Sequence, residues 1–157
     1  NTGNISRLCV AVNSPLMLTG KIGFDFSSSA VKRAGLDHWE HLDFRHFARF
    51  KEFCGFAAGR RIVAVTKGAR VSALDFDFAA SDMLLFGNET MGLPPALLKR
   101  LPDQVQIPMW GKVRSLNLAN SVAVVAYAHI RSVYGAGLTH TVAEFPRTYY
   151  KKHHEIR

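Results

Sequence analysis

Polar groups suited to ligand binding follow two apolar runs of the chain. The runs Met83–Phe86 and Val105–Ile107 have the composition of buried strands, and each stops at a turn of small, polar or fixed-φ residues. The first turn runs from Gly87 to Pro95 and contains two glycines, which let the backbone approach a ligand or take a positive φ. The second runs from Pro108 to Arg114 and leads into Ser115-Leu116-Asn117. Polar groups at strand ends beside a helix N-terminus are typical of ligand sites in α/β proteins, so the two turns predict one site.

The elements that must position these turns are predicted from hydrophobic spacing. Ser115 is predicted as the N-cap of a long helix over Leu116–Tyr134 that ends at Gly135. Apolar residues at helical spacing between Ile5 and Val12 predict an opening helix, and phenylalanines at every third position predict an amphipathic helix over Arg45–Cys54. The other predicted elements are strands at Leu16–Thr19 and Ile62–Val65, a loop at Gly20–Ser29, a helical turn at Ala30–Ala34 and a helix start near Pro94. This alternation predicts an α/β fold with a mainly parallel sheet and helices on both faces.

Length and composition are those of one globular domain. The chain has 157 residues, of which 48% are hydrophobic, and no apolar run approaches the ~20 residues that span a bilayer. The N-terminus lacks the basic-then-apolar pattern of a signal peptide. Cys9 and Cys54 are isolated thiols that form neither a CxxC pair nor a disulfide framework. We therefore expect a cytoplasmic protein that does not act at a membrane.

The balance of charge favours a polyanionic partner. The net charge is +8 with an isoelectric point near 9.9, and phosphate contacts would release counterions and steer encounter. The alternative is a basic face that is merely solvated. Lysines and arginines gather beside the turns, at Lys32/Arg33, Arg60/Arg61, Lys67/Arg70 and Lys112/Arg114. The histidines at 38, 41, 153 and 154 lack a third ligand at suitable spacing, so no metal is predicted.

Several separate stretches, in the right order, resemble the motifs of the SPOUT class of RNA methyltransferases, the TrmH/SpoU superfamily. They are NTGNISRLC at 1–9, GFDF at 23–26, RAGLD at 33–37, FGNETMGLP at 86–94, IPM at 107–109 and VRSLNLANSVAV at 113–124. The pattern is most similar to the TrmL branch, whose members move a methyl group from S-adenosylmethionine to a ribose 2′-hydroxyl. The resemblance covers residues 1–137 as a single domain and fades over 138–157, a basic tail.

The resemblance implies features that composition and spacing do not. It implies a deep trefoil knot in the C-terminal part of the domain, although chain connections normally avoid threading. It also implies a homodimer in which the site is completed across the interface. Family members carry a strand before the Asn-Thr-Gly-Asn motif. We expect the printed sequence, rather than the protein, to lack this strand, because its neighbours would otherwise keep unpaired backbone groups.

The resemblance also assigns roles to particular residues. Arg7 is the candidate to accept the hydroxyl proton, or instead to position a phosphate and stabilise a developing alkoxide, and both roles stay open. Glu89, Ser115 and Asn117 would orient substrate or cofactor beside it. S-adenosylmethionine would bind in a bent form, without a metal, at Val65, Thr66, Gly87, Asn88, Ile107, Met109, Ser115 and Leu116. RNA would be bound by Asn1, Asn4, Arg7, Arg33, Lys67, Lys112 and Arg114.

Each of these residues also has a purely structural interpretation. Arg7 fits a solvated position on an amphipathic helix, the polar residues fit helix caps, and Gly87 and Gly92 fit a plain turn. Their occurrence inside family motifs favours function. Met91 departs from the pattern, since relatives commonly carry arginine there. The match is therefore weaker for a shared substrate than for a shared cofactor.

The function implied by the TrmL resemblance is ribose methylation of the wobble nucleotide, cytidine or uridine 34, in the anticodon stem-loop of leucine tRNAs. Unpaired loop nucleotides can be splayed into a pocket, whereas bases of a duplex cannot. One alternative keeps the reaction and changes the target to another tRNA position or to ribosomal RNA. An alternative of another class is a non-catalytic RNA-binding module with the same fold.

Overall fold

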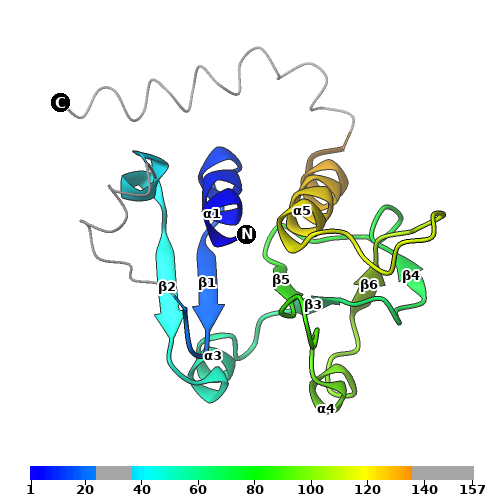
Figure 1. Cartoon of the computed structure of the whole chain (residues 1–157), viewed down its shortest axis with the longest axis horizontal. Coiled ribbons are helices and arrows are strands. Elements are labelled where there is room, and N and C mark those ends of the chain that lie inside the picture. Colours follow the sequence, from blue (N-terminus) through cyan, green and yellow to red (C-terminus); the bar gives the residue numbers. More distant parts are fainter. Residues whose placement is uncertain (24–36, 136–157) are drawn as a thin grey trace.

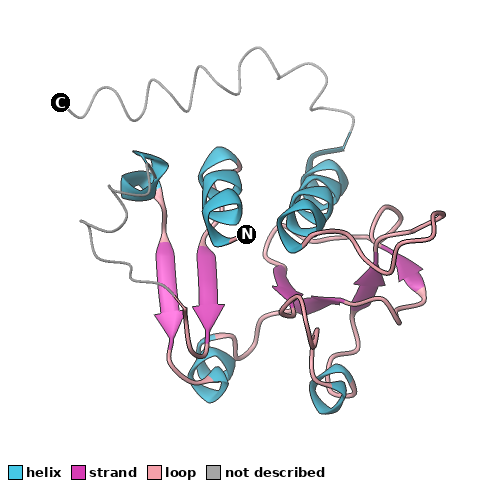
Figure 2. Cartoon of the chain, viewed as in Figure 1, coloured by secondary structure: helices cyan, strands magenta, loops and turns pink. Residues whose placement is uncertain are grey.

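The computed structural model describes residues 1–23 and 37–135, in which short helices and strands alternate. The elements are α1 (Thr2–Ala11), β1 (Leu16–Thr19), the 3-10 helix η1 (Asp37–His41), β2 (Phe44–Phe47), α3 (Phe50–Phe56), β3 (Ile62–Val65), β4 (Val71–Ser72), β5 (Met83–Phe86), α4 (Pro95–Leu98), β6 (Gln104–Gln106) and α5 (Leu118–Tyr134). Figure 2 shows how these helices and strands are distributed. The predicted turn at 30–34, most of the predicted loop at 20–29 and the tail at 138–157 lie outside the described residues.

Every pairing between these strands is parallel, as the sequence predicts. β1 pairs with β2, and a second sheet has the strand order β4-β6-β3-β5. β3 therefore lies between β5 and β6, although both follow it in the chain. α5 lies on one side of the four-stranded sheet and α4 on the other (Figure 1). The α/β fold with parallel strands is confirmed, whereas the division into two sheets was not predicted.

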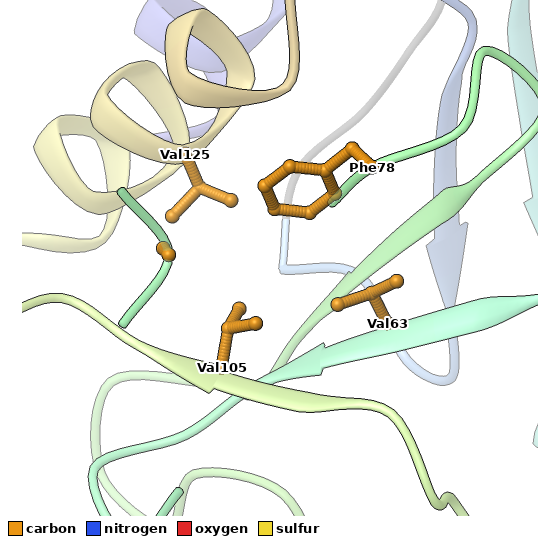
Figure 3. Packing of buried hydrophobic residues seen from close by; sticks show 5 residues of the cluster. Val63, Phe78, Val105 and Val125 are labelled. Carbon is orange, nitrogen blue, oxygen red and sulfur yellow. The ribbon is translucent and has the colours of Figure 1, made fainter. Parts of the chain in front are cut away.

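The core of the four-stranded sheet lies beneath α5. Val63 of β3, Val105 of β6 and Val125 of α5 are all fully buried, and Phe78 packs with them. Figure 3 shows Val125 reaching from the helix toward Phe78 and Val105. Alternate strand residues face the same side of a sheet, so β3 presents both Val63 and Val65 to this cluster. Over residues 1–23 and 37–135, no helix is long and apolar enough to cross a membrane.

The predicted helix over Arg45–Cys54 is wrong. Residues 44–47 form β2, and α3 begins only at Phe50, where the Glu52 carboxylate accepts hydrogen bonds from the amide and the Nε of Arg49. Phenylalanines spaced by three do meet, since the Phe47 ring lies 5.8 Å from that of Phe53 and 5.5 Å from that of Phe56. The stripe is thus a packed cluster that spans a strand, a turn and a helix, and its spacing alone imitates one helix.

The predicted start of the last helix is also wrong, whereas its end is confirmed. The N-cap is Asn117 rather than Ser115, because the Asn117 Oδ1 accepts hydrogen bonds from the amides of Ala119 (2.9 Å) and Asn120 (3.4 Å). Serine and asparagine are both strong N-cap residues, so the sequence offered two starts and the hydrogen bonds select the later one. Gly135 ends the helix with φ +59°, a conformation that favours glycine.

A buried ion pair joins the amino ends of β3 and β5. The Arg61 Nε and Nη2 atoms donate to the two carboxylate oxygens of Asp82 at 2.7 and 2.6 Å, and the Ala79 amide also donates to Asp82. The Asp82 side chain is fully buried, while 38% of the Arg61 side chain is exposed. Burial acts to raise the pKa of Asp82, but the hydrogen bonds from Arg61 and Ala79 outweigh it, so this pKa lies below its ordinary value.

We expect Asp82→Asn to lower the free energy of unfolding by about 3 kcal/mol, because the variant leaves the Arg61 guanidinium without its buried counter-charge. Urea unfolding of both proteins measures the difference. Asp43→Asn is the matched control, since Asp43 lies 3.9 Å from Arg45 and both side chains are exposed. Its effect should stay below about 1 kcal/mol. Equal losses in the two variants would contradict the importance of the buried pair.

The same ion pair predicts how stability depends on acid. A carboxylate whose folded pKa is depressed stabilises the fold above its unfolded pKa, and the contribution disappears as pH falls through the folded pKa. The ordinary pKa of Asp82 is 3.8, and the folded value is lower. The stability difference between wild type and Asp82→Asn should therefore be constant at neutral pH and shrink below about pH 4. A difference that grows in acid would show the opposite shift.

Candidate functional site

The turns that the sequence singled out leave the four-stranded sheet at one edge. Val65 lies opposite Phe86 of β5 on one side and Val105 of β6 on the other. The Thr66 amide extends this alignment by donating to the Val105 carbonyl at 2.9 Å. Because the strands are parallel and in this register, Thr66, Gly87 and Ile107 all follow the carboxyl ends of neighbouring strands. This edge is where open α/β sheets bind their ligands.

The Gly87 loop is closed on itself by backbone contacts. An ideal Cβ at Gly87 would lie 2.0 Å from the Gly92 carbonyl carbon and 2.3 Å from the Leu93 amide nitrogen, so no other residue fits. Asn88 forms an antiparallel bridge with Gly92, and its Oδ1 accepts from the amides of Thr90 (3.1 Å) and Met91 (2.7 Å). Gly92 has φ +67°. The loop is therefore more constrained than a plain turn.

A side-chain contact joins this loop to the start of the chain. The Asn1 Nδ2 donates to the Glu89 Oε1, across 88 residues of sequence. Hydrogen bonds to the Glu89 carboxylate from its own backbone amide and from Asn1 hold its pKa below the ordinary value. Glu89 is therefore an ionised acceptor at neutral pH. The contact brings the Asn-Thr-Gly-Asn motif to the strand ends, as a shared site requires.

The rotation of α1 is fixed by its buried side. The Ser6 Oγ donates to the Gly3 carbonyl at 2.7 Å and lies 2.8 Å from the His38 Nε2 of η1, and Ser6 is fully buried. Since the hydroxyl proton goes to Gly3, the imidazole Nε2–H donates to Ser6. α1 also packs against α5. Asn4 and Arg7, one helical turn apart, are consequently left on the exposed side of α1.

The loop before α5 carries the remaining predicted residues. Ser115, Leu116 and Asn117 are exposed, and the side-chain oxygen of Asn117 caps the helix. Ser115 does not cap the helix, and it makes no hydrogen bond within the described part of the chain. Trp110, which the sequence analysis overlooked, is 89% exposed in this loop. Its position in the sequence, between Met109 of the predicted cofactor site and Lys112 of the predicted RNA-binding set, is the signal that points to Trp110.

The predicted RNA-binding cations are partly grouped. Lys67, Lys112 and Arg114 are exposed on the loops that follow β3 and precede α5, while Arg33 lies outside the described residues. Among residues 1–23 and 37–135, no group of three histidine, cysteine or acidic side chains is placed to hold a metal. Burial raises the pKa of the Cys9 thiol to about 11, so this thiol stays protonated at neutral pH. The chemistry available at the site is that of a guanidinium, a carboxylate, a hydroxyl and backbone groups.

Comparison with known proteins identifies the same stretches. Residues 1–127 match the SpoU rRNA Methylase family. A protein of Aeromonas hydrophila named tRNA (cytidine(34)-2′-O)-methyltransferase is 41% identical over 139 residues, which cover 87% of this chain and 89% of that protein.

Solved structures agree with this match. One, described as "Structural insights into the 2-OH methylation of C/U34 on tRNA", has a TM-score of 0.76 and 42% identity, covering 83% of this chain and 86% of its own. The SpoU methyltransferase AviRb of Streptomyces viridochromogenes, in complex with the cofactor AdoMet, has a TM-score of 0.67 and 29% identity, covering 83% of this chain and 56% of its own. With its parallel sheet, its Gly87 and Ser115 motifs and a match over residues 1–127, the chain belongs to the SpoU family of RNA methyltransferases.

Proposed function

We propose that the protein transfers a methyl group from S-adenosylmethionine to the ribose 2′-hydroxyl of nucleotide 34, cytidine or uridine, in the anticodon loop of leucine tRNAs. The contact between Asn1 and Glu89 carries the proposal, because it joins the helix that bears Arg7 to the loops at the strand ends. The name of the relative from Aeromonas hydrophila supports the tRNA target. We infer that the protein acts in the cytoplasm, where tRNA is available.

The residues at the strand ends fit S-adenosylmethionine. Val65 and Ile107 are half-buried apolar side chains on adjacent strand ends, and Leu116 is exposed on the loop that returns to α5. They suit the walls of an adenine pocket. The Gly92 backbone fills the space of a Gly87 side chain, so the loop is held in one shape at the strand end, where its backbone groups could bind a ligand. When bound, this cofactor supplies an electrophilic methyl group on a sulfonium centre.

The chain's own residues would align the ribose hydroxyl with the methyl group. An oxygen–carbon bond forms, the carbon–sulfur bond breaks to release S-adenosylhomocysteine, and the hydroxyl proton passes to solvent water. The Arg7 guanidinium is a cation with several N–H donors, suited to hold a phosphate and to stabilise negative charge on the oxygen. Ionised Glu89 and the hydroxyl of Ser115 would orient the ribose. Alignment of the two reactants provides most of the rate enhancement in this scheme.

One observation favours a second RNA target. Met91 is 81% exposed at the tip of the Gly87 loop, where relatives commonly carry arginine. An apolar side chain cannot replace a phosphate contact, so the RNA is held differently at this point. A different tRNA position or a ribosomal RNA would fit this change without altering the reaction.

We infer that the segment from β5 to α5 forms the deep trefoil knot of the class. The placement of β3 between two strands that follow it in the chain supports this. The turns that hold the cofactor would then be fixed by threading as well as by hydrogen bonds.

We also infer a homodimer that pairs through α5. Residues 120, 124, 127, 131 and 134 form one exposed helical stripe, which includes Val124, Tyr127 and Tyr134. More than half of the Tyr127 side chain is exposed, at 57%. Apolar stripes of this kind are typical of interaction sites. Because α1 packs against α5, a partner on this stripe would lie near Arg7 and would help to complete the site.

We expect Gly87→Ala to lower the affinity for S-adenosylmethionine at least about tenfold, equivalent to roughly 1.4 kcal/mol. The added methyl group would overlap the Gly92 backbone and force the loop open. Titration calorimetry measures the affinity. Gly55→Ala is the matched control, because a Cβ there meets nothing within 4 Å and the residue lies on α3. Normal binding by Gly87→Ala would place the cofactor elsewhere.

We expect Arg7→Ala to keep cofactor affinity while losing about 100-fold or more in methyl transfer, the scale of a lost charge-stabilising group. Transfer of labelled methyl groups to tRNA, read together with calorimetry, separates the two effects. Arg7→Lys retains a cation and tests whether charge suffices. Arg100→Ala is the control, since this exposed cation precedes β6 at the opposite edge of the sheet. Undiminished transfer by Arg7→Ala would remove Arg7 from the site.

We expect Tyr127→Asp to shift the protein from dimer to monomer, because a carboxylate would be desolvated at the centre of the α5 stripe. Sedimentation velocity at micromolar concentration measures the species present. Lys51→Asp, on the exposed surface of α3, changes charge without touching the stripe and should leave the dimer intact. A Tyr127→Asp protein that remains dimeric would exclude this face.

A further inference from the structure

The two tryptophans of the chain have opposite environments. Trp39 is half-buried, and its ring lies 5.3 Å from the ring of Phe44. Trp110 is 89% exposed in the loop between β6 and α5. Figure 1 draws this loop in yellow, extending away from the sheet before the chain returns to α5. A tryptophan held in water forgoes the large apolar burial that normally favours this residue.

Positive charge surrounds Trp110. Lys112 and Arg114 are exposed within four residues of it, and Val113 beside them is 64% exposed. No aspartate or glutamate occurs between Asp103 and Glu144, so the loop and the whole of α5 carry only basic charges. An exposed aromatic ring and exposed cations on one loop that carries no acidic residue are the composition of surfaces that bind single-stranded nucleic acid.

We propose that Trp110 is a stacking platform for an unpaired base of the RNA substrate, with Lys112 and Arg114 neutralising the phosphates on either side of that base. The proposal rests on the proposed function, since it takes the substrate of the same site to be RNA. Every base has a π-face, so stacking holds a nucleotide without reading its identity. Trp110 would therefore set affinity for a looped RNA and leave base preference to the pocket at the strand ends.

The position of the loop suits this role. It begins at Pro108, just after the carboxyl end of β6, and ends at the N-cap of α5. A base on Trp110 would flank the nucleotide whose ribose reacts. The exposed Met91 of the neighbouring Gly87 loop supplies no charge. Trp110 and its two cations would provide an RNA contact that Met91 cannot.

Fluorescence tests the proposal directly. In a Trp39→Phe background, Trp110 is the single remaining tryptophan, since the chain has two. An anticodon stem-loop RNA should quench its emission, and a duplex of the same stem without a loop should quench it much less. Quenching by S-adenosylhomocysteine alone would assign Trp110 to the cofactor site. A spectral change on dilution of the protein alone would assign it to the subunit interface, and either result would overturn the proposal.

Affinity measurements provide the second test, and they need no Trp39 variant. Trp110→Ala should raise the Kd for the stem-loop about tenfold, whereas Trp110→Phe, which keeps a ring, should raise it less than about threefold. Val113→Ala, in the same exposed loop, is the matched control and should bind as wild type. Lys112→Ala and Arg114→Ala should each reduce the salt dependence of binding by about one ion.

The two proposals fail in different ways. If the stem-loop RNA binds and quenches the Trp110 emission but receives no methyl group, the proposed reaction fails while the stacking role stands. If it methylates RNA and Trp110→Ala binds the stem-loop as tightly as wild type, the stacking role is overturned while the reaction stands.

Discussion

Parallel pairing of β3 with both β5 and β6 is the constraint on which the site depends. The register sets Val65 opposite Phe86 and Val105, so three strands end at the same level. The turns that follow them therefore lie at the same edge of the sheet. Nothing in the turns themselves brings them to one another. The buried valines beneath α5 stabilise that register, because a shift of one residue would expose them to the other face. The packing of the core therefore also determines the geometry of the candidate site at the strand ends.

A second constraint acts within the edge. Gly87 lies so close to the backbone of Gly92 that a methyl group would not fit. The Asn88 Oδ1 accepts hydrogen bonds from the Thr90 and Met91 amides of the same loop. This rigid loop presents Glu89 outward, where Asn1 meets it. A carboxylate held in this way ties the start of α1, the helix that bears Arg7, to the strand ends. The cost of a constrained loop is offset by preorganisation of the groups that must align.

The sequence predicted those parts of the fold whose signals are local. Leu16–Thr19, Ile62–Val65 and Met83–Phe86 have the observed bounds because each is a short apolar run stopped by polar or turn-forming residues. The Phe44–Phe53 spacing misled because a period of three is compatible with a strand, a turn and a helix in succession. The choice between Ser115 and Asn117 as the cap, the two-residue β4 and the division into two sheets depend on contacts between distant residues. The grouping of Gly87 with Thr66 and Ile107 was predictable from strand ends, whereas the Asn1–Glu89 contact, 88 residues apart, was not.

The two edges of the four-stranded sheet differ in how their cations are paired. At the amino ends of the strands, Arg61 forms an ion pair with the fully buried carboxylate of Asp82, which neutralises its charge. At the carboxyl ends, Lys67, Lys112 and Arg114 are exposed, and α5 adds basic residues without any acid. Some of the exposed cations that could meet a polyanion therefore lie beside the turns, whereas others, such as Lys51 and Arg100, lie elsewhere on the surface. RNA attracted by these cations would meet the strand ends, where Asn1 at the start of α1 contacts Glu89 of the Gly87 loop.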